Sequence, residues 1–298
     1  MSNGFEIESG TELSIALRRA SAYLAERGIS QPYVEAELLA AYFLSRERAE
    51  EIGRGRVQTL AMLGATVPTG FAEAVEMRGE RVPLQHITGQ AFFRYLTLKV
   101  GPGVFSPRPE TELLVDRVLQ EIDTRPEQSL KIVDLCTGSG AIAASIASER
   151  PGHEVFAVEL SELAHAWAQE NVASLDVHLI LGDATSALAR YVGTFDIVAT
   201  NPPYIPNGAV PQDPEVRDHD PAMALYGGSE DGLQIPAQIA THAFELLRPG
   251  GLLVMEHAET QRDSMRAVFT RCGFVELESI NDLNMRPRHT VGRKPAGR

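Results

Sequence analysis

The sequence predicts an α/β protein built on a mostly parallel sheet, with a helical domain before it and a short hairpin between them. The apolar run 131–133 leads into the glycine-rich loop 134–140 and then into a helix of small residues, 141–147. Further strand-like runs, 154–158, 177–181 and 195–200, each end in polar residues. Because parallel strands of an open sheet bind ligands at their carboxyl ends, these polar residues are expected to share one site.

The first part of the chain is predicted to be helical over residues 9–79. Apolar residues recur at helical spacing from Leu13 to Leu24, Ser9 and Glu12 have the spacing of a capping box, and Gly28 can end the helix. Further helices are expected from near Pro32 and over 71–79. The aromatic and β-branched segment 91–104, with the breaker 101–103, predicts a hairpin.

After the fourth strand, the expected elements are a helix over 232–247, a strand over 251–256, a helix over 261–272, and strands over 275–278 and 289–292. The domains are therefore predicted as an N-terminal helical domain (1–90), a β-hairpin linker (91–107) and a sheet domain (108–298).

Composition favours a cytoplasmic protein. The chain has 298 residues, 44% of them hydrophobic, which suffices for a sizeable core and two domains. No segment reaches the ~18 apolar residues of a membrane span, and the first ten residues lack the apolar core of a signal peptide. Cys136 and Cys272 have no metal-like spacing, so neither a disulfide nor a metal site is expected. The formal net charge of -13 argues against binding of free nucleic acid.

The most informative motif is Asn201–Pro202–Pro203–Tyr204, directly after the strand 195–200. Two prolines fix the backbone, so the Asn201 side-chain carbonyl and the Pro202 backbone carbonyl can both accept from one planar NH2 group. The alternative interpretation is an Asn-Pro turn beside a buried tyrosine.

The glycine loop has two interpretations as well. Glu159 ends the second strand, where a carboxylate can accept hydrogen bonds from both hydroxyls of a ribose. The pattern Gly138-x-Gly140-x-x-Ala143 also fits a dinucleotide-binding unit, which leaves an NAD-binding module as the alternative. Asp134, Asp183 and the Asn201 loop add polar groups at successive strand ends, and this favours the first interpretation.

With these motifs the chain resembles the class I S-adenosylmethionine (SAM) methyltransferases that act on amide or exocyclic amino nitrogen. Other segments resemble the PrmC/HemK family, the release-factor glutamine N5-methyltransferases. These segments are 83–89, 106–112, 216–221, 227–232 and 248–251. The resemblance covers about Ala36 to Lys294 and implies a Rossmann-like seven-stranded sheet whose last strands form an antiparallel hairpin. It also implies that the N-terminal helical domain (1–90) is a substrate-recognition domain.

The resemblance implies that the chain methylates the glutamine of the Gly-Gly-Gln motif in class 1 peptide chain release factors, with S-adenosylhomocysteine as the second product. The implied cofactor-binding residues are Cys136, Thr137, Gly138, Ser139, Gly140, Glu159, Asp183, Ala184 and Asn201. The implied catalytic residues are Asn201, Pro202 and Tyr204, and the implied substrate-binding residues are these three with Pro203 and Phe105.

Neighbouring residues receive supporting roles. Arg108, Glu110 and Thr111 are expected to brace the floor of the pocket, and a structural role for Glu110 and Glu112 is preferred to an acid–base pair. The chain departs from the usual family pattern at Cys136, Glu159, Ser106 and Arg94, where Gly, Asp, an aliphatic residue and a hairpin glycine are commoner. The alternatives are a ribosomal-protein glutamine methyltransferase and, ranked lower, a nucleic-acid amino-group methyltransferase.

Overall fold

The computed structural model describes residues 6–126 and 128–297, and it divides the chain into two compact units. Unit 1 comprises Met1–Gly89 together with Gln212–His219, and unit 2 comprises Gln90–Pro211 and Asp220–Arg298. The argument against a signal peptide falls partly on residues 1–5, which lie outside the described residues. Within the described part of the chain, no helix combines the length and the apolar character that a membrane crossing requires.

Unit 1 is a helical bundle around its own apolar core. Its helices are α1 (Leu13–Glu26), α2 (Pro32–Arg48), α3 (Arg54–Met62), α4 (Phe71–Gly79), α5 (Leu84–Thr88) and α9 (Pro214–His219). The predicted helical stripe of α1 is confirmed, because the residues at helical spacing are fully buried: Leu13, Ala16, Leu17, Ala20 and Leu24. Gly28, with φ of +74°, follows the end of α1 as expected.

The capping box expected at Ser9 is wrong. Ser9 lies in a turn, and α1 begins only at Leu13. The reason is a contact distant in sequence: Glu12 forms a β-bridge with Thr66, and Leu13 N donates to the Ala65 carbonyl (2.7 Å). The backbone at Glu12 is therefore extended and cannot continue a helix started at Ser9.

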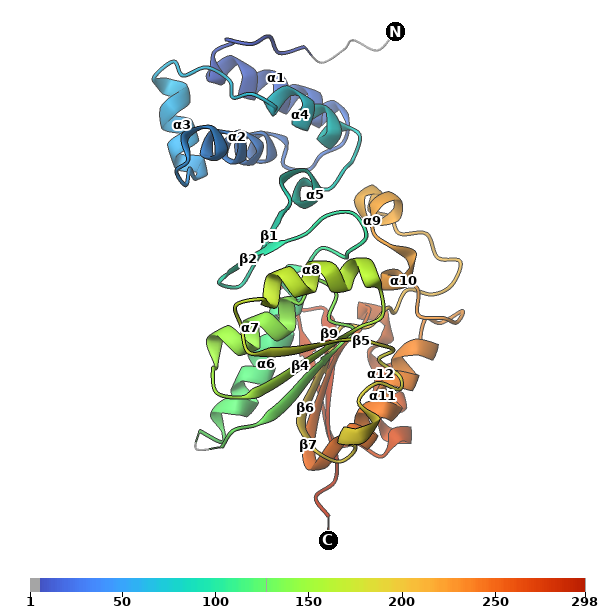
Figure 1. Cartoon of the computed structure of the whole chain (residues 1–298). Helices are drawn as coiled ribbons and strands as arrows, with labels where there is room; N and C mark the ends of the chain where they lie inside the picture. The colour runs from blue at the N-terminus through green and yellow to red at the C-terminus, as the bar shows by residue number, and fades with distance from the viewer. Residues whose placement is uncertain (1–5, 127, 298) are drawn as a thin grey trace. The chain divides into compact units, whose positions relative to one another are not determined.

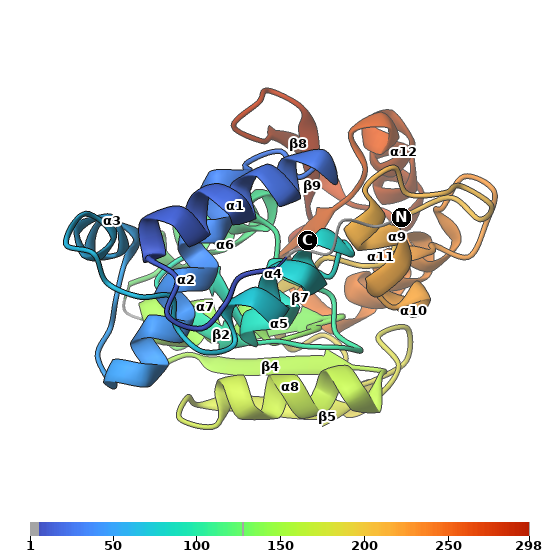
Figure 2. The same ribbon diagram turned by 90° about the horizontal axis from the view of Figure 1, so that it is seen from above.

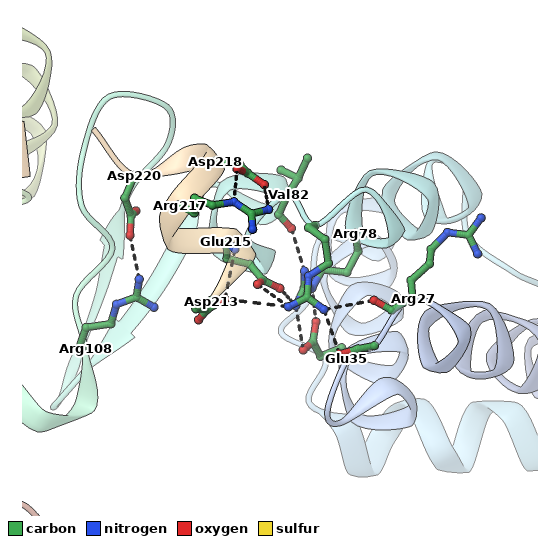
Figure 3. Close-up of polar contacts among 12 residues, drawn as sticks. Arg27, Glu35, Arg78, Val82, Arg108, Asp213, Glu215, Arg217, Asp218 and Asp220 are labelled. Atoms are coloured by element: carbon green, nitrogen blue, oxygen red, sulfur yellow. Dashed lines mark hydrogen bonds and ion pairs between the residues drawn. The ribbon is translucent and has the colours of Figure 1, made fainter. Parts of the chain in front are cut away.

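Ion pairs hold α9 within unit 1 (Figure 3). Glu215 accepts from Arg78 Nη2 (2.7 Å) and Arg81 Nη2 (2.6 Å), while Arg78 also pairs with Glu35. Burial opposes ionisation of Glu215, but hydrogen bonds with Asp213, Arg81 and Arg78 outweigh it and lower its pKa to about 2. A segment distant in sequence thus becomes part of the helical unit.

The hairpin is formed by β1 (Gln90–Phe93) and β2 (Leu96–Lys99), which pair antiparallel as expected. Arg94 occupies the turn with φ of +52°, a conformation that favours glycine. Its guanidinium pairs with Glu149 (2.5 Å) and Asp116 (2.7 Å), and its backbone N–H donates to Glu112 Oε1 (2.9 Å). The contacts fix the hairpin to α6 (Glu112–Asp123) and α7 (Ala141–Glu149), and the two ion pairs among them could not form with a glycine at this position.

The seven-stranded sheet of unit 2 has the order β5-β4-β3-β6-β7-β9-β8, with β9 antiparallel to both neighbours. Its strands are β3 (Lys131–Leu135), β4 (Glu154–Glu159), β5 (Val177–Leu181), β6 (Phe195–Thr200), β7 (Leu247–Glu256), β8 (Val275–Asn281) and β9 (Pro287–Arg293). This confirms the predicted fold class. β7 begins four residues before the predicted start at 251, because Leu247 already pairs with Phe195 and the pairing shifts before it resumes at Leu252.

Helices cover both faces of the sheet (Figures 1 and 2). One face packs against α6 and α7, and α8 (Glu162–Val172) follows α7 beside β5. The opposite face packs against α11 (Gln234–Leu246) and α12 (Arg262–Cys272). Neighbouring strand residues alternate between the two cores, so that Ile132 lies in one and Val133 in the other. The short helix α10 (Ala222–Leu225) and the 3-10 turns η1 (Pro109–Thr111), η2 (Ala189–Tyr191) and η3 (Glu259–Gln261) complete the unit.

Candidate active site

The glycine loop after β3 has a backbone that only small residues accommodate well. Cys136, Gly138 and Gly140 all have positive φ, of +62°, +58° and +84°. Thr137 N donates to the Val158 carbonyl (2.9 Å), which ties the loop to β4. A Cβ on Gly140 would lie 3.2 Å from Val172 in α8, whereas one on Gly138 would meet nothing within 4 Å. The loop is therefore packed on one side and open at Gly138.

Glu159 lies beside that opening. Its Oε2 accepts from Gly138 N (2.8 Å) and its Oε1 from Ser161 N (2.8 Å). Burial raises the pKa of Glu159 more than these hydrogen bonds lower it. Each carboxylate oxygen retains an acceptor position, so the side chain is oriented by backbone and can still bind two hydroxyl groups.

Asp183 follows β5 and caps a turn. Its Oδ1 accepts from the backbone N (2.8 Å) and the hydroxyl (2.7 Å) of Thr185, and these bonds lower its pKa. Among the described residues, none donates to its Oδ2. Ala184 is buried against the core on the α11 face. Strand ends β3, β4 and β5 thus bring the predicted cofactor residues to one edge of the sheet.

The thiol of Cys136 lies in this loop but is not activated. Burial raises its pKa, and the negative charges of Glu159 and Asp134 raise it further. Across residues 6–126 and 128–297, no group of three or more His, Cys, Asp and Glu side chains could hold a metal ion.

The Asn201 loop continues β6 at the same edge. Thr200 Oγ1 donates to the Leu135 carbonyl (2.7 Å) and so joins the ends of β6 and β3. Asn201 Nδ2 donates to Thr111 Oγ1 (3.3 Å), and Tyr204 Oη donates to Glu256 Oε1 (3.4 Å). Burial raises the pKa of Tyr204, and the charge of Glu256 adds to this, so the phenol keeps its proton. In the described part of the chain, no donor reaches Asn201 Oδ1 or the Pro202 carbonyl.

Close backbone packing fixes the far side of this loop. Gln261 Nε2 donates to the Tyr204 carbonyl (2.8 Å) and to the Asp231 carbonyl (2.9 Å). A Cβ on Gly232 would lie 2.2 Å from the Tyr204 oxygen, and one on Gly227 would lie 1.9 Å from the Gly232 oxygen. Glycine at 232 therefore lets the segment 227–232 back directly onto the Asn201 loop, while glycine at 227 lets this segment pack against its own backbone.

The segment before α6 contacts residues around the Asn201 loop, and the role of Arg108, Glu110 and Thr111 as the floor of a pocket stays a prediction. Arg108 pairs with Asp220 (2.9 Å) and stacks over Phe105 at 4.9 Å from the ring centroid (Figure 3 shows the ion pair). Thr111 Oγ1 donates to Glu256 Oε2 (2.7 Å). Glu112 Oε1 accepts from the backbone N–H of Arg94 (2.9 Å), so this side chain makes a structural contact with the hairpin.

Glu256 is the site residue that the sequence analysis missed. It ends β7 and is 2% exposed, and it accepts from both Thr111 and Tyr204. His289 Nε2 lies 3.4 Å from its Oε2. The sequence did contain a signal for it. Glu256 follows the apolar run 252–255 at the carboxyl end of a predicted strand, just as Glu159 follows the run 154–158.

The sheet order, the glycine loop and the acidic residues at the strand ends define a class I methyltransferase. Residues 95–213 match the family model "Methyltransferase small domain", and residues 16–89 match "PrmC N-terminal domain". Release factor glutamine methyltransferases of Bifidobacterium longum and Streptomyces coelicolor are 43% and 44% identical to this chain. The alignments cover 92% and 93% of this chain and 96% of each relative. The chain belongs to the PrmC/HemK family of release factor glutamine methyltransferases.

A solved structure supports the fold independently. The Thermus thermophilus 16S rRNA N2 G1207 methyltransferase (RsmC), in complex with AdoMet and guanosine, matches with a TM-score of 0.52. It is 21% identical, and the match covers 69% of this chain and 49% of that chain. The cofactor of this class of enzyme is S-adenosylmethionine, and the residues present fit it. Gly138 leaves open space beside the two oriented oxygens of Glu159, and the Asp183 side chain offers a further acceptor.

Proposed function

We propose that this chain transfers the methyl group of S-adenosylmethionine to the side-chain amide nitrogen (N5) of the glutamine in the Gly-Gly-Gln motif of class 1 peptide chain release factors. The observation that carries the proposal is the pair of carbonyl groups at Asn201 and Pro202, which accept from no donor among the described residues. Together they match the two N–H donors of one carboxamide. The family relatives are named release factor glutamine methyltransferases.

The reaction requires the protein mainly to align the amide nitrogen with the methyl group that it attacks. An amide nitrogen is a weak nucleophile because its lone pair is delocalised into the carbonyl, whereas the sulfonium methyl of the cofactor is a strong electrophile when bound. Asn201 and Pro202 would orient the amide NH2 and stabilise the positive charge that develops on nitrogen. Tyr204, partly buried and protonated, would form a wall that excludes water. Glu159, Asp183 and the glycine loop would hold the cofactor.

Glycines beside the target glutamine suit this site, since a segment without flanking side chains meets little obstruction above Tyr204. The helical unit would supply docking surface for the rest of the release factor, and the reaction would take place in the cytoplasm, where translation terminates. Phe105, stacked with Arg108, and Pro203 would line the entry for the substrate.

Charge disfavours free nucleic acid as the substrate, although the acidic loop 212–231 contributes little to this argument. Within that loop, Glu215 pairs with Arg78 and Arg81, and Asp220 pairs with Arg108. These acids are neutralised by partners rather than presented to a ligand. The argument therefore depends on the net charge of -13.

The test is methylation of purified release factor by the enzyme and cofactor, followed by mass spectrometry of the tryptic peptide that contains Gly-Gly-Gln. One added methyl group on that glutamine is expected. Asn201→Ala should lower kcat about 100-fold or more while the cofactor affinity stays within a few-fold. Asn207→Ala, an exposed asparagine in the same loop, is the matched control and should retain activity. Methylation of a ribosomal protein or of adenine, with the release factor untouched, would refute the substrate assignment.

A further inference from the structure

The inference concerns the buried hydrogen-bond chain beneath the Asn201 loop, and it depends on the proposed amide substrate. Asn201 Nδ2 donates to Thr111 Oγ1 (3.3 Å), and Thr111 Oγ1 donates to Glu256 Oε2 (2.7 Å). Thr111 and Glu256 are 4% and 2% exposed, so water does not compete for these groups. The three residues come from the β6 end, the turn before α6 and the β7 end.

The direction of each bond in this chain follows from Glu256. A carboxylate has only acceptor atoms, so the hydroxyl of Thr111 must give its single proton to Glu256. The Thr111 oxygen can then only accept from its other neighbour. Asn201 must therefore turn its NH2 group toward Thr111, which leaves its carbonyl oxygen to face away from the chain.

The same carboxylate fixes Tyr204. Its hydroxyl donates to Glu256 Oε1 (3.4 Å), while Thr111 occupies Oε2. One buried acid thus sets the proton direction of both polar contacts beneath the loop, and His289 at 3.4 Å lies beside the same oxygen.

We propose that Glu256 and Thr111 are positioning residues that determine which substrate group the site accepts. Because the NH2 group of Asn201 donates to Thr111, the carbonyl oxygen of Asn201 faces the substrate. This orientation selects a carboxamide, which can donate a hydrogen bond, over a carboxylate, which can only accept one. Neither residue touches the reacting atoms. Their effect passes through the orientation of the Asn201 side chain, whose amide is otherwise nearly symmetric in shape.

The experiment compares Thr111→Val, Thr111→Ser and Glu256→Gln with the unmodified enzyme. Valine keeps the shape of threonine but cannot accept from Asn201, while serine keeps the hydroxyl. Glutamine at 256 can donate to Thr111 and so removes the fixed direction. We expect Thr111→Val and Glu256→Gln to lower kcat roughly 10- to 100-fold with unchanged cofactor affinity. Thr111→Ser should keep the kcat of the unmodified enzyme. Thr241→Val, an exposed threonine on α11, is the matched control.

The second measurement separates orientation from general damage to the fold. Affinity is measured by calorimetry, with S-adenosylhomocysteine present, for a release factor carrying Gly-Gly-Gln and for one carrying Gly-Gly-Glu. The unmodified enzyme should prefer the glutamine form, and this preference should shrink at least several-fold in Thr111→Val and Glu256→Gln. A variant that unfolds is recognised by the loss of its Trp167 fluorescence signal. The other of the two test variants, Thr111→Val or Glu256→Gln, then carries the comparison, with Thr111→Ser as the folded reference.

An unchanged kcat and an unchanged glutamine preference in both folded variants would overturn the proposal while leaving the methyltransferase activity intact. An unmodified enzyme that methylates no release factor would instead refute the proposed function itself. The two failures are therefore distinguishable.

Discussion

Asp134 is a buried carboxyl group whose titration should be measurable in the stability of the sheet unit. Its Oδ2 accepts from Thr137 Oγ1 and from Ala143 N, and its Oδ1 has no partner among the described residues. Burial raises its pKa from 3.8 to about 7, against the effect of the two hydrogen bonds. Between these two values the native state binds more protons than the unfolded state, so stability falls as the pH rises.

The magnitude follows from the shift. About three pKa units correspond to a loss on the order of 4 kcal/mol across the whole titration. Roughly two of these units lie between pH 5 and pH 7, which amounts to a loss of about 3 kcal/mol over that interval. Asp134→Asn replaces the acid with a neutral group of the same shape, whose oxygen can still accept from Thr137 and Ala143. The free energy of unfolding of this variant, relative to the unmodified protein, should therefore rise by about 3 kcal/mol from pH 5 to pH 8.

The assay is urea unfolding at pH 5, 6, 7 and 8 without cofactor, followed by the fluorescence of Trp167. This residue is the single tryptophan and lies in α8, so its signal reports on the sheet unit. Asp123→Asn is the control: Asp123 is exposed and Arg150 lowers its pKa, so its difference from the unmodified protein should stay flat over this range. If the free energy of unfolding of Asp134→Asn, relative to the unmodified protein, did not change with pH, the conclusion that Asp134 is protonated in the folded state below pH 7 would be refuted.

Substitutions at three further positions, with a control at a fourth, test the loops of the site. Glu159→Ala should weaken cofactor binding by roughly 1.5 to 3 kcal/mol through lost charge-assisted hydrogen bonds, and unchanged calorimetric affinity in a folded variant would remove Glu159 from the cofactor site. Cys136→Gly should be about 1 kcal/mol more stable in urea unfolding than Cys136→Ala, because φ at this position is +62°, and the reverse order would contradict strain there. Gly232→Ala should destabilise the protein and lower kcat, since its Cβ would lie 2.2 Å from the Tyr204 oxygen. Gly208→Ala is the control, because φ at Gly208 is +83° but a Cβ there would meet open space, so this substitution should cost only the backbone strain of about 1 to 2 kcal/mol. If Gly232→Ala and Gly208→Ala changed kcat equally, the clash between residue 232 and the Tyr204 oxygen would be contradicted.

Local patterns were enough to predict most elements of the sheet. β5 and β6 have the predicted bounds, because each is an apolar run interrupted by turn residues. The start of β7 and the start of α1 could not be predicted in the same way, since both depend on backbone pairing with segments distant in sequence. The order of the strands came from the family resemblance, because periodicity does not determine which strands are neighbours.

The candidate site shows the same division. The placement of Glu159, Asp183 and Asn201 at one edge of the sheet was predictable, because each lies at the end of its strand or shortly after it and the parallel sheet brings strand ends together. The contact between Thr111 and Glu256 was not predictable, since the two residues are 145 positions apart and meet through side-chain geometry. The direction of these hydrogen bonds was not predictable either. It is set by Glu256, which can only accept, and this follows only once the hydrogen-bonded series Asn201–Thr111–Glu256 is known.

The ion pairs of Glu215 affect how the role of the helical unit can be tested. This residue belongs to a segment that follows the Asn201 loop in sequence, yet Arg78 and Arg81 of the helical unit hold it. Deleting residues 1–90 would remove both arginines and release the segment 212–219, whose continuation, Asp220, pairs with Arg108. Lost activity after such a deletion would therefore not distinguish a missing docking surface from a disturbed loop. Substitutions on the exposed faces of α1 to α4 that leave Arg78, Arg81 and Glu215 intact make that distinction, because only the contact with release factor changes.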